Sequence, residues 1–176
     1  GLWYILLGLF IVTMAGAEEY QARTTAALAG VRVRDVMTPQ PETVPGDLTV
    51  ARFLHDVLLF RRHSAFPLVD AFGRVEGLIT LNRIRSLSPE ERATALLRQV
   101  ACPVNEVPTA APDELLTDLL PRLGGCADGR ALVFERGRLV GIVSPTDISR
   151  AAALHGLTAE IGSGGPDISP GHPWSR

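Results

Sequence analysis

A hydroxyl and a carboxylate lie three residues apart in the stretch GIVSPTDIS, residues 141–149, at Ser144 and Asp147. The pattern predicts the end of a strand, a tight turn and the start of a helix, where a Ser and a later acid form a capping box. The same groups can also hold a ligand, because a carboxylate accepts two hydrogen bonds from vicinal ribose hydroxyls. Unpaired N–H groups in the first turn of a helix suit a phosphate. Both interpretations stay open from these residues alone.

A second copy of this turn, GLITLNRIR at residues 77–85, keeps the glycine, the apolar pair and a hydroxyl at Thr80. Arg83 stands where the other copy has its acid. A guanidinium only donates hydrogen bonds, so it cannot accept one from a ribose. We therefore expect one working turn, and a second that is empty, filled by the guanidinium, or paired with an anion.

Both turns belong to an internal repeat. RDVMTPQPETVPGDLTVARFLHDVL is similar to RQVACPVNEVPTAAPDELLTDLLPRL, and FPLVDAFGRVEGLITLNRI is similar to RALVFERGRLVGIVSPTDI. Each copy predicts an extended stretch, a helix with Asp47 or Asp113 as N-cap, a hairpin of two apolar strands and a second helix. The resulting β-α-β-β-α unit of roughly 55 residues is too short for a good core of its own. We expect an α+β fold in which two such units pack as a pseudo-twofold pair.

The segments outside the repeat differ in composition. Residues 1–17 carry no charge and span roughly 25 Å as a helix, which favours a transmembrane helix over a signal peptide or a buried helix. A polar, helix-favouring stretch ends at Gly30, and Ser88-Pro89 is typical of a helix start. The expected division is a transmembrane helix (1–17), a connector helix (18–30), a first unit (31–87), a linker (88–97), a second unit (98–155) and a disordered tail (156–176).

Composition excludes several classes of protein. The net charge is −2 and aromatic residues make up 6%, which argues against a nucleic-acid partner. The four histidines, at 55, 63, 155 and 172, include no pair spaced four apart, so the His-Glu-x-x-His zinc motif is absent. Cys102 and Cys126 form no CxxC motif, which favours two small buried thiols over a disulfide or redox switch. The chain itself therefore offers no catalytic residues.

Several motifs of the repeat together resemble a known family. They are VMTP with a following TVP, HSAFPLVD, the Gly-containing hairpin, and the Gly-x-x-Ser/Thr-x-x-Asp turn. With them the repeat resembles a tandem pair of CBS domains, or Bateman module. An apolar segment followed by AEEYQAR, GVRVRDVMTP and HSAFPLVD also resembles the C-terminal region of site-2 protease family intramembrane zinc metalloproteases. In that case the catalytic zinc would belong only to an upstream part of the protein.

The CBS resemblance implies two clefts, each composed of residues from both units. Their ligand would be AMP, ADP, ATP or S-adenosylmethionine, with Asp147 on the ribose, Ser64 on the phosphate, and Val44 and Phe66 on either side of the adenine. The implied first cleft comprises Thr43, Val44, Pro45, Ser64, Ala65, Phe66, Ser144, Thr146 and Asp147. The doubtful second cleft comprises Thr80, Arg83, Val107, Pro108 and Thr109, with Arg130 nearby.

The resemblances lead to one functional expectation and two alternatives. We expect a regulatory, nucleotide-sensing CBS pair on the cytoplasmic side of the cell membrane, anchored through residues 1–17 and forming a homodimer. The first alternative treats the chain as the tail of an enzyme, a zinc metalloendopeptidase. The second is a ligand-free dimerisation module of another membrane protein or of a stand-alone protein.

Overall fold

The computed structural model describes residues 28–57 and 63–163, with side chains as far as Gly156. Within these residues, no helix has the length and apolar character that a bilayer crossing requires. The predicted transmembrane helix at 1–17 and most of the predicted connector lie outside the described residues. The described end of that connector, residues 28–30, is a turn in which Gly30 has a φ of 81°. Gly30–Ile148 form one compact unit that contains every strand described below.

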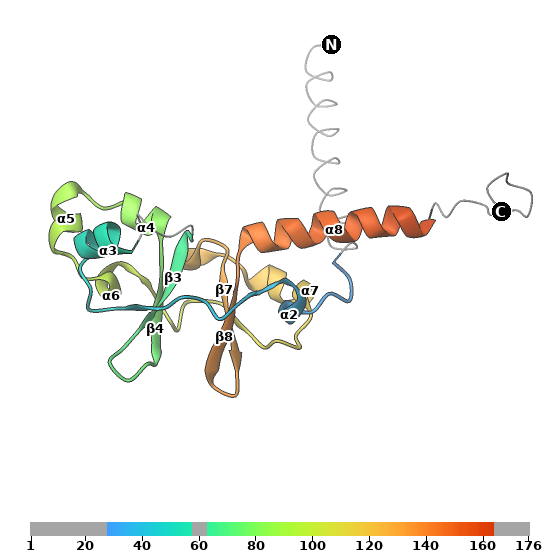
Figure 1. Cartoon of the computed structure of the whole chain (residues 1–176), viewed down its shortest axis with the longest axis horizontal. Coiled ribbons are helices and arrows are strands. Elements are labelled where there is room, and N and C mark those ends of the chain that lie inside the picture. Colours follow the sequence, from blue (N-terminus) through green and yellow to red (C-terminus); the bar gives the residue numbers. More distant parts are fainter. Residues whose placement is uncertain (1–27, 58–62, 164–176) are drawn as a thin grey trace, which may run out of the picture. The chain divides into compact units, whose positions relative to one another are not determined.

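The two copies of the repeat have the same order of elements (Figure 1). The first copy consists of β2 (Val44–Pro45), α3 (Val50–Asp56), β3 (Ala65–Val69), β4 (Val75–Thr80) and α4 (Leu81–Arg85). The second consists of β6 (Thr109–Ala110), α7 (Leu116–Leu119), β7 (Ala131–Glu135), β8 (Arg138–Val143) and α8 (Pro145–Ser163). The predicted β-α-β-β-α order is confirmed in both copies, and the fold is α+β.

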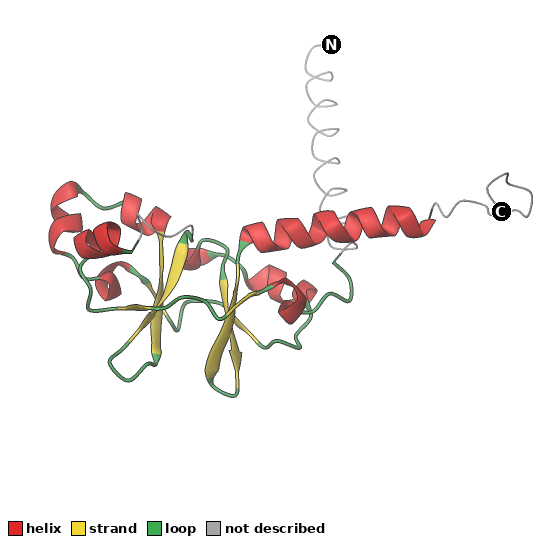
Figure 2. Cartoon of the chain, viewed as in Figure 1, coloured by secondary structure: helices red, strands yellow, loops and turns green. Residues whose placement is uncertain are grey.

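Each copy gives one short strand to the sheet of the other. Strand β1 (Thr38–Pro39) follows α2 (Val33–Val36), and β5 (Cys102–Pro103) follows α6 (Leu97–Val100). One sheet has the order β1-β8-β7-β6 and the other β2-β3-β4-β5. Figure 2 shows the strands in yellow. Strand β1 is antiparallel to β8, and β5 is antiparallel to β4. This exchange joins the two copies through backbone hydrogen bonds.

Two clusters of buried side chains bear on how the copies pack in the part of the chain that the structure describes. The first centres on the first copy, where Phe53 meets Phe66 edge-on with 5.3 Å between ring centroids, and it also includes Leu97, Val100 and Ala101 from the start of the second copy. The second draws on both copies and contains Leu78, Cys102, Val107, Ala127, Leu132 and Ile142. The units share this second cluster because neither is long enough to bury its apolar surface alone.

Three sequence-based expectations about local structure are wrong. The N-caps of α3 and α7 are Thr49 and Leu115, not Asp47 and Asp113. The Thr49 hydroxyl accepts a hydrogen bond from the Arg52 N–H, as is usual for a threonine at an N-cap. The Asp113 carboxylate instead forms an ion pair with Arg34 at 2.7 Å. Helix α8 continues to Ser163, so the expected disordered tail does not begin at residue 156. The helix-favouring run AAALHGLTAEI contains no proline that would end it.

The third wrong expectation concerns the cysteines. Cys102 and Cys126 are joined by a disulfide with 5.3 Å between their Cα atoms, rather than being separate thiols. Cys102 lies on β5, and Cys126 lies on the short 3₁₀ helix η3 (Gly125–Ala127). Because β5 pairs with the first copy, the bond links that sheet to a loop of the second copy.

The helix start expected at Ser88-Pro89 is confirmed by α5 (Pro89–Thr94), which lies inside the predicted linker. Ser88 accepts the Glu91 N–H at 3.3 Å, and the Glu91 carboxylate accepts the Ser88 N–H at 2.7 Å. These hydrogen bonds to Ser88, the backbone one first, lower the pKa of Glu91 below its usual value. Ser88 and Glu91 therefore form both reciprocal hydrogen bonds of a capping box.

Ser88→Ala should lower the free energy of unfolding by about 1 kcal/mol, because it removes the N-cap acceptor. The Glu91 carboxylate, with its lowered pKa, stabilises the folded state above the unfolded pKa and loses this effect as pH falls through the folded pKa. Urea unfolding of wild type, Ser88→Ala and Glu91→Gln at neutral and acidic pH checks both points. A Glu91→Gln effect that grows on acidification would contradict them. Thr94→Ala, at the other end of α5, is the matched control.

Candidate ligand-binding clefts

The turn between β8 and α8 forms the predicted capping box. Ser144 Oγ accepts the Asp147 N–H at 3.3 Å, and Asp147 Oδ2 accepts the Ser144 N–H at 2.9 Å. Ser144 Oγ also donates to Asp147 Oδ2 at 2.6 Å. The second carboxylate oxygen, Oδ1, lies 3.5 Å from Thr38 Oγ1. One carboxylate oxygen thus accepts the capping hydrogen bonds at the start of the helix, and the other faces the Thr38 hydroxyl of the first copy.

Thr38 is a site residue that sequence reasoning missed. It stands in the VMTP stretch, far from Asp147 along the chain. It reaches Asp147 because β1 pairs with β8, with Thr38 opposite Ile142. The available signal was the repeat itself, since exchanged strands bring the start of one copy to the turn of the other.

The turn that carries Arg83 is built differently. Thr80 Oγ1 caps α4 by accepting the Arg83 N–H at 3.4 Å, and it donates to Asp128 Oδ2 at 2.5 Å. The second copy thus supplies a carboxylate to the turn that lacks its own. The Arg83 guanidinium donates through Nε to the carbonyl oxygen of Val100 at 2.5 Å. The Arg83 side chain therefore already has a hydrogen-bond partner, the backbone carbonyl at the end of α6.

A largely buried arginine lies between the two copies. The Arg130 side chain is 13% exposed, and its guanidinium donates to Ser64 Oγ at 2.8 Å and to the Asp128 carbonyl oxygen at 3.1 Å. The nearest Asp128 carboxylate oxygen is 3.9 Å away. Asp128 has a φ of 52° and Gly129 a φ of 71°, so a left-handed turn sets the direction in which Arg130 enters. The arrangement presents a cation and a hydroxyl together, as an anion site requires.

Arg130 and the capping box meet at the same end of the β7–β8 hairpin. Ala131 pairs with Val143, so Arg130 and Ser144 are the next residues on the two strands. A Cβ on Gly129 would lie 3.3 Å from the Pro145 ring, which shows how closely this turn approaches the start of α8. Ser64, the partner of Arg130, precedes β3 of the other sheet. Groups from both copies therefore converge here.

The structure separates Thr43–Pro45 from this point. Val44 pairs with Leu68 and Pro45 with Val69, at the hairpin end of β3. Ser64 lies at the opposite end of β3, roughly 13 Å away at the usual rise per strand residue. The buried side chains of Val44 and Phe66 belong to the first core cluster, at 4% and 1% exposure. Neither offers the open face that the expected adenine sandwich needs.

The remaining predicted residues divide between surface and core. Thr146 is exposed in the first turn of α8, and Ala65 is half-buried opposite Thr80. Val107 belongs to the second core cluster. The Pro108 carbonyl accepts the Leu132 N–H at 2.9 Å, and Thr109 pairs with Leu132 in the sheet. Val107–Thr109 thus lie along β7 and are not brought to Arg83 by the sheet pairing.

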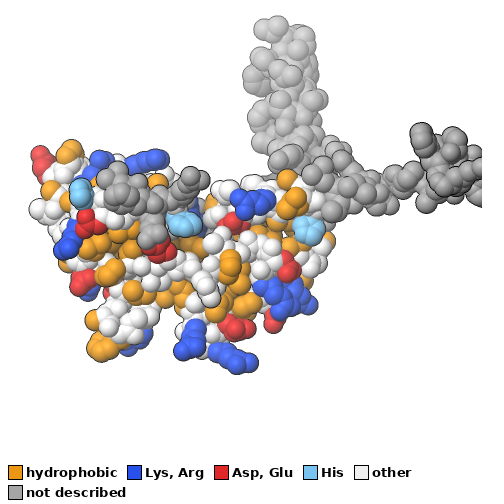
Figure 3. All heavy atoms as spheres, viewed as in Figure 1, with side chains coloured by type: hydrophobic (Ala, Val, Ile, Leu, Met, Phe, Trp, Pro, Cys, Tyr) orange, Lys and Arg blue, Asp and Glu red, His pale blue; other side chains and the backbone are white. Residues whose placement is uncertain are grey.

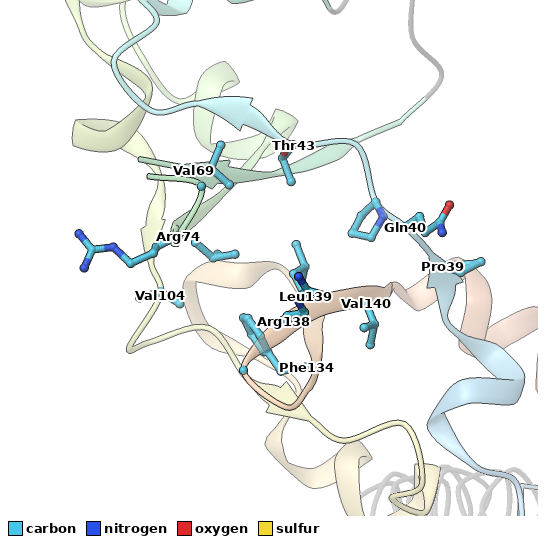
Figure 4. A pocket seen from close by; sticks show the side chains of 14 residues that line it. Pro39, Gln40, Thr43, Val69, Arg74, Val104, Phe134, Arg138, Leu139 and Val140 are labelled. Carbon is cyan, nitrogen blue, oxygen red and sulfur yellow. The ribbon is translucent and has the colours of Figure 1, made fainter. Parts of the chain in front are cut away.

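An open groove of about 1080 Å³ lies between the hairpins at their other end (Figure 4). Thr43 and Val69 face Leu139 and Val140 across it, and Thr43 is the one predicted site residue that lines it among those described. The groove was not expected from the sequence.

Basic side chains gather at the tip of the β7–β8 hairpin (Figure 3). On the β3–β4 tip, Phe72 is 83% exposed under the Arg74 guanidinium.

The family of the chain is identified by comparison with known proteins. A family model described as CBS domain matches residues 33–90 and again residues 97–154, which together make up most of the chain. The chain is a tandem pair of CBS domains. The expected resemblance is thereby confirmed, and the exchanged strands lie at the start of each matched segment.

Two curated relatives each match 89% of the chain. One is the "Putative zinc metalloprotease Rip3" of Mycobacterium tuberculosis, at 41% identity over 158 residues. The other is the "Zinc metalloprotease MJ0392" of Methanocaldococcus jannaschii, at 28% identity over 157 residues. The alignments cover 40% and 42% of those proteins, so the chain spans about two fifths of their length.

Solved structures share the fold of the CBS pair. The CBS domain of the bacterial CNNM/CorC family Mg²⁺ transporter in complex with ATP has a TM-score of 0.62 at 19% identity, over 78% of this chain and 97% of that one. CBSX2 in complex with AMP has a TM-score of 0.59 at 21% identity, over 71% of this chain and 98% of that one. At these identities the likeness concerns the fold.

Proposed function

We propose that this CBS pair is a regulatory module that binds an adenine nucleotide at the start of α8. The observation that carries the proposal is the convergence of Asp147, Thr38 and Ser144 with Arg130 and Ser64. Asp147 Oδ1 is an acceptor for ribose hydroxyls, and Arg130 with Ser64 donates to a phosphate. The solved complexes of related fold with AMP and with ATP support this class of ligand. S-adenosylmethionine, whose ribose needs the same acceptor, belongs in the same test.

Regulation follows from where the ligand contacts lie. Thr38 and Ser64 belong to the first copy, whereas Arg130 and Asp147 belong to the second. A bound nucleotide would favour the arrangement of the two copies in which all of these groups reach it. A ligand shifts such an equilibrium only by its difference in affinity for the two arrangements.

The wider protein is the second part of the proposal. The two zinc metalloprotease relatives support a CBS pair that forms the C-terminal regulatory part of a site-2 protease type zinc metalloprotease. The pair would lie on the cytoplasmic side of the cell membrane and form a homodimer, and the zinc would belong to the protease part. Reading the gene upstream of the codon for Gly1 tests this assignment. Absence of a His-Glu-x-x-His motif there would overturn it. A lack of any thermal shift of the chain across a panel of nucleotides would favour the alternative, a ligand-free dimerisation module.

Arg130→Gln should weaken binding of ATP and ADP about tenfold or more and leave adenosine binding nearly unchanged, because the guanidinium acts on phosphate. Calorimetry of the full chain with adenosine, AMP, ADP and ATP measures this. Arg138→Gln is the matched control, since Arg138 is an exposed arginine that lines the groove at the hairpin tips. Equal losses for adenosine and ATP would contradict the phosphate role. A loss in the Arg138 variant instead would place the ligand in the groove.

A further inference from the structure

Three side chains of types that can bind a metal ion lie close together at the start of the loop that carries Arg130. They are Cys102 on β5, Cys126 on η3 and Glu106 on the turn between them. One ligand atom from each lies within 4.8 Å of the others, and the Cys126 sulfur is 3.5 Å from Glu106 Oε2. Cys102 is fully buried, Cys126 is half-buried and Glu106 is exposed. The cluster therefore has an apolar floor and an open side.

We propose that the reduced form of this cluster binds one thiophilic divalent cation, with Zn²⁺ as the first candidate. Two thiolates and a carboxylate are donors that zinc takes, and the exposed side leaves its fourth position to water. Thiolates select zinc over the harder Mg²⁺ and Ca²⁺. Nothing in the nucleotide proposal uses these three residues, so the two proposals stand or fall separately.

The chemistry begins from the disulfide. A dithiol reductant gives two electrons and two protons to the Cys102–Cys126 bond and itself becomes a disulfide. Binding of the cation then releases both thiol protons, and both sulfurs stay on the metal. Reduction without metal leaves two separate thiols. The disulfide and the metal complex are thus mutually exclusive states of one pair of sulfurs.

The backbone already holds the two cysteines at a suitable separation. Their Cα atoms are 5.3 Å apart. Two sulfurs on a tetrahedral zinc stand roughly 3.8 Å from each other, given Zn–S bonds of about 2.3 Å. Cys102 is held by its pairing with Leu78, and Cys126 by the turn around Gly125, whose φ is 62°. Side-chain rotation alone can therefore open the sulfurs enough to admit an ion.

The position of the cluster gives the metal a structural consequence. Cys126 lies two residues before Asp128, which accepts from Thr80, and four before Arg130, which donates to Ser64. In the disulfide form, this loop is tied covalently to β5. The cation would restore that tie in the reduced protein, so the loop is held in two of the three states and released in the metal-free dithiol.

Titration of the full chain with Co²⁺ tests the proposal. The chain is reduced with a phosphine, desalted without oxygen and compared with its untreated disulfide form. We expect one Co²⁺ per reduced chain with thiolate-to-metal absorption in the near ultraviolet, displaced by Zn²⁺, and none in the disulfide form. Cys126→Ser should abolish the absorption, and Glu106→Gln should weaken Co²⁺ binding about tenfold. Glu135→Gln, an exposed carboxylate on β7, is the control that should bind as wild type.

Three results would overturn the proposal. They are no thiolate absorption from reduced wild type, unchanged binding by Cys126→Ser, and a stoichiometry of one metal to two chains. Circular dichroism confirms that each variant is folded. The wild-type disulfide form is a folded control that needs no substitution, so a misfolded Cys126→Ser variant leaves the comparison of the two redox forms intact.

Discussion

Asp147→Asn should weaken AMP binding by roughly 10- to 100-fold while leaving the chain folded. Loss of a charged acceptor of two hydrogen bonds costs about 1.5–3 kcal/mol. Asn keeps an oxygen that can accept the Ser144 N–H, so the capping hydrogen bond at 2.9 Å need not be lost. Calorimetry with AMP and with its 2′-deoxy form measures the effect, because removing one ribose hydroxyl should matter in wild type and little in the variant.

Asp113→Asn is the matched control for this experiment. Asp113 is an exposed acid of the same copy, paired with Arg34, and lies outside the proposed cleft. Thermal unfolding of both variants separates stability from binding. Equal AMP affinity in wild type and Asp147→Asn, or an equal loss in Asp113→Asn, would contradict the ribose role of Asp147.

Gly77→Ala should lower the free energy of unfolding by about 1–3 kcal/mol, the usual cost of forcing atoms into a packed site. A Cβ at Gly77 would lie 2.7 Å from the carbonyl oxygen of Cys102, so β5 must move away from β4. That pairing is one of the two strand exchanges that join the CBS domains. Urea unfolding of the full chain under non-reducing conditions measures the change.

Gly141→Ala is the natural control, because Gly141 occupies the same place in the second copy. A Cβ there would meet the side chain of Met37 rather than backbone, and a methionine can change rotamer. We expect the smaller loss of stability at Gly141. Equal effects at the two glycines would contradict the idea that backbone contact limits the β4–β5 pairing.

The repeat made the elements and their order predictable. Short apolar strands, the hairpin glycines and the Ser88-Pro89 helix start depend on residues close together in the chain, and these expectations are confirmed. The capping box of Ser144 and Asp147 is equally local. The N-caps at Asp47 and Asp113 were wrong because the turn before each helix continues for two more residues, a boundary that composition does not set.

The site was less predictable because long-range pairing builds it. Thr38 reaches Asp147 only through the exchange of β1, and Asp128 supplies the carboxylate that Arg83 cannot. The repeat offered an indirect signal for the first contact, and local spacing offered none for the second. Val44 and Phe66 are suitable types for an adenine site, but the same apolar character places them in the core. The disulfide likewise depends on β5 joining the other sheet, which the spacing of Cys102 and Cys126 does not reveal.

The crystal structure of the full chain grown with AMP tests the central claim most directly. We predict one nucleotide at the start of α8, with its ribose hydroxyls within hydrogen-bonding distance of Asp147 and its phosphate against Arg130 and Ser64. A nucleotide bound instead in the groove beside Thr43, or beside Arg83, would contradict this account, as would a chain that remains empty at saturating AMP.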